Sequence, residues 1–138
     1  MITLNPNLKK DSYLLGHIDN SAILLMRNAL FPWFVIVPDT EEIEFYKLHI
    51  NQQIEILHQI TAVSRFIEEN NQIDKMNIAT IGNFVSQLHI HIVGRNKLDE
   101  CWPGVVWGSK AFEAYEMTQV KLIKEKLSTH LGNNFKTH

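Results

Sequence analysis

The most informative stretch of this sequence reads Gln87-Leu88-His89-Ile90-His91-Ile92-Val93-Gly94-Arg95. Polar and apolar residues alternate along it with a period of two, which predicts a β-strand with one buried face. Successive side chains on a strand point to opposite faces, so Gln87, His89 and His91 are expected to share one face, with the apolar residues between them facing the core. Neighbours in that row would lie roughly 6–7 Å apart, since each residue rises about 3.3 Å. The sequence therefore predicts an amide and two imidazoles side by side.

The composition is that of an ordinary globular protein. The chain has 138 residues, of which 45% are hydrophobic and 20% charged, and residues 1–138 are expected to form a single domain. A net charge of −2 gives no reason to expect binding to nucleic acid or to a membrane surface. The single cysteine, Cys101, excludes an internal disulfide and a multi-cysteine zinc site. No signal peptide opens the chain and no apolar run approaches the roughly 18 residues of a membrane span, so a cytoplasmic protein is expected.

Hydrophobic patterning predicts an α+β protein with an antiparallel sheet. Short apolar runs bounded by turn residues predict strands over 13–17, 22–26, 34–37 and 76–81. Apolar residues at spacings of three and four predict a helix ending at Asn70-Asn71, with an inward stripe of Ile50, Ile54, Leu57, Ile60, Val63 and Ile67. A second helix is expected over about 109–131, capped by Ser109 and stopped by Gly132, while the core of the domain spans about 13–110.

Three interpretations of the two histidines remain open on these grounds. A zinc or iron site needs a third protein ligand, but the residues after His91 include Arg95 and Lys97, whose positive charge opposes a bound cation. A solvated strand face with two incidental histidines fits the pattern equally well. The third interpretation is catalysis on phosphorus, in which one imidazole attacks and the second delivers a proton to the leaving group. Gly82-Asn83 could bind phosphate oxygens through backbone N–H groups, and Arg95 could stabilise their charge.

The tryptophans are expected to have structural roles. Trp33 follows Pro32 and precedes a predicted strand, which favours packing in the core or at an interface. Trp102 and Trp107 could stack on a base or cover the site, but packing is the expectation for both.

The stretch resembles the signature of the histidine triad (HIT) superfamily, in which His, apolar, His, apolar and His precede two apolar residues. Residues 31–38 and 75–85 resemble the segments that surround this signature, and Trp102-Pro103-Gly104-Val105-Val106-Trp107-Gly108 resembles the tail of a bacterial HIT-like subgroup. The resemblance covers most of residues 13–110. It implies a five-stranded antiparallel sheet with two main helices, assembled as a homodimer. It also implies a nucleotide hydrolase or nucleotidyl transferase that needs no metal or other cofactor.

Carried over position by position, the resemblance gives the polar residues separate roles. His89 takes the position of the nucleophile, which would form a covalent nucleotidyl-histidine by attacking the α-phosphorus of a nucleoside phosphoramidate or dinucleoside polyphosphate. His91 takes the third triad position, close to the leaving group. Gly82 and Asn83 lie on the turn that contacts phosphate, and Asn28 lies near the residue that binds the ribose.

Two residues depart from the family's pattern. Gln87 replaces the first triad histidine, where it can orient a neighbour by hydrogen bonding but cannot titrate. Trp33 stands where many relatives carry a histidine that supports the nucleophile. These departures make a nucleotide-binding module with little or no turnover the first alternative function. A metal-dependent enzyme with His89 and His91 as ligands is the second.

Overall fold

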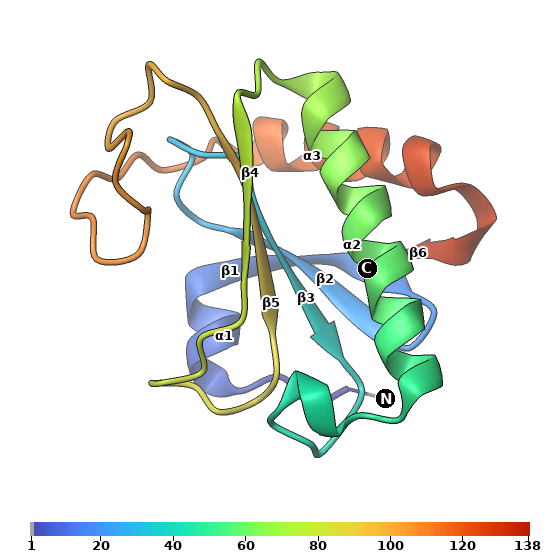
Figure 1. Cartoon of the computed structure of the whole chain (residues 1–138). Coiled ribbons are helices and arrows are strands. Elements are labelled where there is room, and N and C mark those ends of the chain that lie inside the picture. Colours follow the sequence, from blue (N-terminus) through green and yellow to red (C-terminus); the bar gives the residue numbers. More distant parts are fainter. Residues whose placement is uncertain (1) are drawn as a thin grey trace.

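The computed structural model describes residues 2–138 and contains one antiparallel sheet of six strands (Figure 1). The strands are β1 (Ser12–Ile18), β2 (Ser21–Met26), β3 (Trp33–Pro38), β4 (Lys75–Ala79), β5 (Ile90–Arg95) and β6 (Phe135–Thr137), in the spatial order β4-β5-β3-β2-β1-β6. All five neighbouring pairs are antiparallel, which confirms the predicted α+β class. The sequence predicted five strands and missed β6, which pairs with β1 beside Gly16, where a side chain would collide with the carbonyl oxygen of Lys136.

The helices are α1 (Pro6–Asp11), α2 (Ile50–Asn70) and α3 (Met117–Leu131), with 3-10 turns η1 (Phe45–Lys47) and η2 (Gly132–Asn134). The short helix α1, which the sequence analysis did not predict, begins where the side chain of Asn5 accepts a hydrogen bond from the N–H of Asn7. Helix α3 ends at Gly132, as predicted, because its φ of 66° suits a residue without a side chain. Among residues 2–138, no helix is long and apolar enough to cross a membrane.

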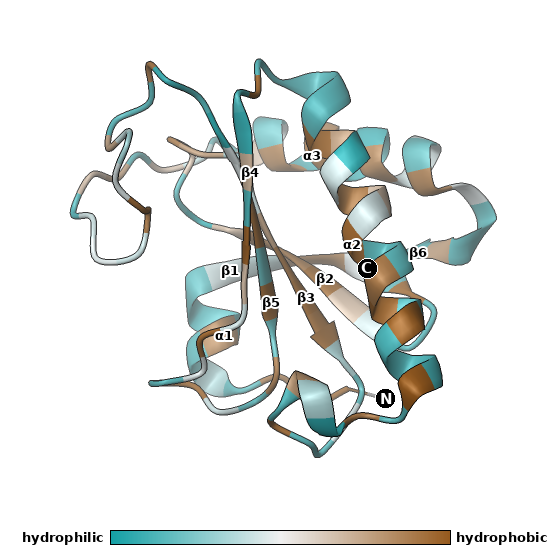
Figure 2. Cartoon of the chain, viewed as in Figure 1, coloured by the Kyte–Doolittle hydropathy of each residue, from teal (hydrophilic) through white to brown (hydrophobic). Residues whose placement is uncertain are grey.

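Two apolar cores lie on opposite faces of the sheet. Phe34 and Ile36 of β3 face the first core together with α2 and α3, while Trp33, Val35 and Val37 face the second core. The second core is closed by Leu8 of α1 and Val106 of the loop after β5. Because both faces are covered, β2 and β3 are apolar along most of their length, as their brown colouring indicates (Figure 2).

Helix α2 buries a different stripe from the one that the sequence predicted. Its buried residues are Ile56, Gln59, Val63, Phe66 and Ile67, whereas Ile50, Ile54 and Leu57 are exposed. The first half of α2 carries apolar residues on two faces, and periodicity alone could not show which face meets the sheet. The prediction was therefore correct for the second half of the helix and wrong for the first.

Helix α3 begins at Met117, eight residues after the predicted cap at Ser109. Its true cap is Glu116, which forms a reciprocal capping box with Gln119. The preceding segment is extended because Ala114 forms an antiparallel bridge with Asn28, and the N–H of Ala29 donates to the carbonyl of Glu113. This pairing across the sequence excludes helix over 109–116.

Strand β5 begins at Ile90, three residues later than predicted. The predicted division of faces is correct within the stretch, since Leu88, Ile90 and Ile92 all belong to the core beneath α2. The opposite face carries His89 and His91 into the second core, so the site lies on the covered side of the sheet, beside Trp33.

Candidate active site

His89 and His91 lie together inside the protein. Their ring centroids are 4.9 Å apart with an interplanar angle of 68°, and the residues are only 7% and 6% exposed. The strand face that carries them is therefore covered, which contradicts the interpretation of a solvated face with incidental histidines. The predicted juxtaposition of the two imidazoles is confirmed.

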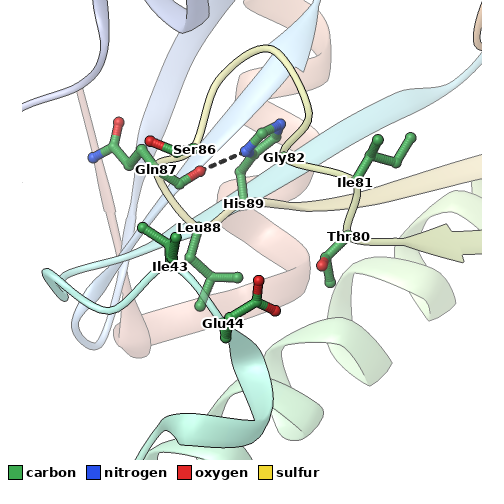
Figure 3. Close-up of a pocket in the computed structure, with 9 residues that line it drawn as sticks. All are labelled: Ile43, Glu44, Thr80, Ile81, Gly82, Ser86, Gln87, Leu88 and His89. Atoms are coloured by element: carbon green, nitrogen blue, oxygen red, sulfur yellow. Dashed lines mark hydrogen bonds between the residues drawn. The ribbon is translucent and has the colours of Figure 1, made fainter.

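His89 is held in one tautomer by the backbone. Its Nδ1 atom lies 2.7 Å from the carbonyl oxygen of Gln87, and this hydrogen bond is drawn in Figure 3. A carbonyl oxygen can only accept, so Nδ1 carries the proton and donates it. The other ring nitrogen, Nε2, then keeps its lone pair, which is the form that a nucleophile requires.

His91 is held in the opposite tautomer by a side chain. The indole N–H of Trp33 donates to His91 Nδ1 at 3.0 Å, so in the neutral ring the proton is on Nε2. Trp107 packs edge-on against the same imidazole, with ring centroids 5.4 Å apart. Burial, and after it the proximity of His89, lowers the pKa of His91 from 6.5 to about 4. His91 is therefore neutral at physiological pH.

The sequence predicted only a packing role for Trp33, and the structure adds a hydrogen bond to His91. Trp33 is buried, as predicted, but its N–H also sets the protonation of His91. Trp107 contacts both Trp33 and His91, and its own indole N–H is buried without a hydrogen-bond partner among residues 2–138. The sequence carried no signal for these contacts, because Trp33 and His91 are 58 positions apart.

The side chain of Gln87 does not orient either histidine, contrary to the expectation from its place in the row. Its carboxamide accepts a hydrogen bond from the N–H of Asn5 at 2.8 Å and donates to the carbonyl of Thr3 at 3.0 Å. Figure 3 shows the carboxamide pointing away from His89. Gln87 thus contacts His89 through its backbone carbonyl, while its side chain holds the segment before α1 in place.

A pocket beside His89 is formed by the turn that leads into β5. Gly82 lines it, as do two residues that the sequence analysis did not single out, Glu44 and Ser86 (Figure 3). Gly82 has a φ of 72°, a conformation that favours glycine. Asn83 is exposed on the same turn and is not one of the residues that line this pocket.

Arg95, which was expected to stabilise the charge of a phosphate, donates its hydrogen bonds to side chains of the protein itself. It is 2% exposed, and its guanidinium donates to both carboxylate oxygens of Asp99, at 2.8 and 3.0 Å. A third N–H donates to Asn77 at 2.9 Å, and the hydrogen bonds that Arg95 donates to the Asp99 carboxylate raise the pKa of Arg95. Because these partners occupy the guanidinium, we leave Arg95 out of the candidate site.

Asn28 also forms hydrogen bonds within the fold. Its amide donates to the carbonyl of Ala111 at 2.9 Å, and its oxygen accepts from the N–H groups of Leu30 and Glu113. These bonds anchor the extended segment before α3. The expected contact with a ribose could use only the second N–H of the amide without displacing one of these bonds.

Among residues 2–138, the two histidines have no third protein ligand beside them with which to hold a metal ion. Within the described chain, residues 2–138, no three His, Cys, Asp or Glu side chains gather in a way that could hold a metal ion. His91 Nδ1 is already engaged by Trp33. The donor set that the two histidines provide is therefore two imidazoles, each with its Nδ1 atom already engaged in a hydrogen bond.

Comparison with known proteins links this geometry to one group of proteins. A model of the HIT domain matches residues 7–98. The chain is 36% identical to a histidine triad protein from Marinobacter aquaeolei VT8, with a TM-score of 0.88 over 95% of this chain and 96% of that one. It is 34% identical to a histidine triad protein from Bradyrhizobium japonicum, with a TM-score of 0.89 over 94% and 98% of the two chains.

A more distant structure shares the fold alone. It is a hypothetical histidine triad nucleotide-binding protein from Sulfolobus tokodaii strain7, 16% identical, with a TM-score of 0.63 over 91% of this chain and 87% of that one. No curated protein matches the sequence.

Proposed function

The chain belongs to the HIT domain family, and from this premise we propose that it is a hydrolase or transferase acting at the α-phosphorus of a nucleotide conjugate. His89 is the proposed nucleophile. The observation that carries the proposal is the hydrogen bond from His89 Nδ1 to the Gln87 carbonyl, which leaves Nε2 with a free lone pair. His91, 4.9 Å away between ring centroids, supplies a second polar group at the same place.

The proposed reaction has two steps. The Nε2 lone pair of His89 attacks phosphorus, a nitrogen–phosphorus bond forms, and the bond to the leaving group breaks. The imidazole of the adduct carries a positive charge, which the Gln87 carbonyl stabilises through Nδ1–H. Water then attacks phosphorus and loses one proton to the solvent, the nitrogen–phosphorus bond breaks, and the electron pair returns to Nε2.

Binding of the phosphate is assigned to the turn that precedes β5. Gly82 lines the pocket with His89, and Asn83 follows it on the exposed side of the turn. Backbone N–H groups in such a turn can hold phosphate oxygens without bringing another charge into the site. Phosphoryl-type transition states are loose and highly charged, so positioning of this kind supplies most of the catalysis.

The test is to trap the covalent intermediate. The protein is incubated with radiolabelled diadenosine triphosphate or adenosine phosphoramidate in the presence of EDTA, quenched, and analysed by peptide mass spectrometry. We expect an acid-labile adenylyl group on His89 and turnover that His89→Ala abolishes. His58→Ala, which changes an exposed histidine of α2, is the matched control and should behave as wild type.

Each other outcome has a defined meaning. Nucleotide binding without an adduct or turnover would contradict the proposal and favour a nucleotide-binding module. Activity that EDTA removes and zinc or iron restores would contradict the histidine mechanism.

We further propose that two copies of the chain assemble as a homodimer. Within residues 2–138, strand β4 pairs only with β5 and forms one edge of the sheet, and its Ile78 is exposed. An edge strand can pair with its own copy about a two-fold axis, because such an interface is self-complementary. Light scattering should give twice the mass of the chain, about 32 kDa from a chain mass of 16.0 kDa, and Ile78→Lys should shift it toward the monomer. A wild-type monomer at micromolar concentration would contradict this assignment.

A further inference from the structure

We infer, building on the proposed function, that the enzyme selects nucleotide substrates whose leaving group departs as an anion, and that Trp33 imposes this selection. The preferred substrate class is then the nucleoside phosphoanhydrides, and phosphoramidates are cleaved much less efficiently. Trp33 is a positioning residue, because it acts on the reaction through the protonation of His91.

The hydrogen bond between Trp33 and His91 is possible only when His91 is neutral. The indole N–H is a donor with no acceptor capacity, and it points at His91 Nδ1 from 3.0 Å. A protonated imidazole carries N–H groups on both nitrogens, so in protonated His91 the Nδ1–H group would face the indole N–H of Trp33 with no acceptor between them. Trp33 therefore favours the neutral ring with its single proton on Nε2.

The fold gives Trp33 little freedom to move away. Strands β3 and β5 pair with Val35 opposite His91 and Trp33 opposite Val93, so Trp33 and His91 are diagonal neighbours on the same face. Trp33 is 9% exposed and contacts Trp107 edge-on, with ring centroids 6.1 Å apart. Its indole is thus fixed by the strand register and by packing.

The rest of the surroundings of His91 also disfavours a charge. The aromatic rings against it are Trp33, Trp107 and His89, and of these only His89 can titrate. With a pKa of about 4, His91 would be protonated in about one molecule in a thousand at pH 7. It remains a good hydrogen-bond donor through Nε2–H, but it is a poor proton donor.

The difference between a hydrogen-bond donor and a proton donor determines which substrate bonds can break. In an anhydride, the electron pair of the broken phosphorus–oxygen bond leaves on a phosphate oxygen, which is stable as an anion because the second pKa of a phosphate monoester is about 6. No proton has to be transferred. In a phosphoramidate, the electron pair leaves on nitrogen, and the departing amine must receive a proton as the bond breaks. Neutral His91 cannot supply that proton without becoming an imidazolate.

The test compares two substrates that carry the same adenylyl group. Diadenosine triphosphate releases ADP, and adenosine phosphoramidate releases ammonia. For the wild type we expect kcat/KM to be at least about 100-fold higher for the anhydride, since general acid catalysis contributes about 10²–10⁴-fold. Protonation of His91 should contribute no pH dependence to the anhydride rate between pH 5.5 and 8, because His91 does not titrate there.

Two variants connect the preference to Trp33. Trp33→Phe removes the N–H donor but keeps an aromatic ring, and Trp33→His offers a ring that can also accept. Both should raise phosphoramidate cleavage at pH 6 about tenfold and introduce a pH dependence, without raising anhydride cleavage. Trp102→Phe is the matched control and should retain the wild-type preference.

Nitrogen-15 NMR of the histidine rings tests the protonation of His91 independently of turnover. At pH 6, wild-type His91 should show an unprotonated Nδ1, and in Trp33→Phe the ring should titrate closer to pH 6.5. A protonated His91 Nδ1 in the wild type at pH 6 would overturn the inference.

The kinetic outcomes separate this inference from the proposed function. If the wild type cleaves the phosphoramidate as fast as the anhydride through the His89 adduct, the selection is wrong and the proposed function stands. If neither substrate gives turnover or an adduct, both fail.

Discussion

Asp99→Asn should destabilise the protein strongly, although Asp99 lies outside the candidate site. The carboxylate of Asp99 accepts two hydrogen bonds from Arg95, at 2.8 and 3.0 Å, and two from the backbone N–H groups of Asn96 and Cys101, both at 3.2 Å. Arg95 is 2% exposed and the side chain of Asp99 is 8% exposed. Removing one partner of such a buried pair leaves the other charge uncompensated, which costs about 3–5 kcal/mol. We expect a loss of about 3 kcal/mol or more.

The measurement is urea denaturation at one protein concentration, followed by tryptophan fluorescence. Glu100→Gln, a change of the same kind at the exposed neighbouring residue, should alter the free energy of unfolding by less than about 0.5 kcal/mol. The double variant Arg95→Met with Asp99→Leu should be less destabilised than Asp99→Asn, because it leaves no unpaired charge. A loss below about 1 kcal/mol in Asp99→Asn would refute the reasoning.

Three further changes test other parts of the structure. Gln87→Ala removes two hydrogen bonds to the segment before α1, so the free energy of unfolding should fall by about 1–2 kcal/mol. Hydrogen exchange at the Asn5 amide should accelerate, and an unchanged exchange rate would contradict the hydrogen bond between Asn5 and Gln87. Gly94→Ala places a methyl group 2.6 Å from Ile67 Cγ2 and Ile73 Cδ1, and overpacking should cost about 1–3 kcal/mol in chemical denaturation. Acidification from pH 6.5 to pH 4 should lower the free energy of unfolding by about 3 kcal/mol, because the pKa of His91 is about 4 in the folded protein and higher in the unfolded chain, which therefore binds the proton first. His91→Gln should lose this part of the pH dependence.

Local patterning predicted the features of the fold that depend on neighbouring residues. The alternation in the 87–95 stretch placed both histidines on one face and the intervening apolar residues in the core. It could not predict that β5 begins only at Ile90, because pairing with β3 starts there, at Ile36. Likewise, nothing local indicated that residues near 114 would pair with Asn28 and delay the start of α3.

The two imidazoles of the candidate site were predictable from the sequence, whereas the residues that surround them were not. The two imidazoles follow from their spacing of two residues on one strand. The partners of Arg95, Asn28 and Gln87 depend on contacts between distant segments, such as that of Gln87 with Thr3 and Asn5. The role of Trp33 depends on the register between β3 and β5, which a single sequence does not contain.

The burial of Arg95 against Asp99 also determines how a substrate would be captured. Its charge is neutralised inside the protein, and the residues that line the pocket beside His89 include Glu44 but no lysine or arginine. An anionic substrate therefore approaches without attraction from a cation in this pocket, in a protein whose own net charge is −2. Association should therefore gain little from electrostatic steering and should change little with ionic strength. On the proposed function, phosphate would be recognised by the placement of neutral donors and not by attraction to a cation.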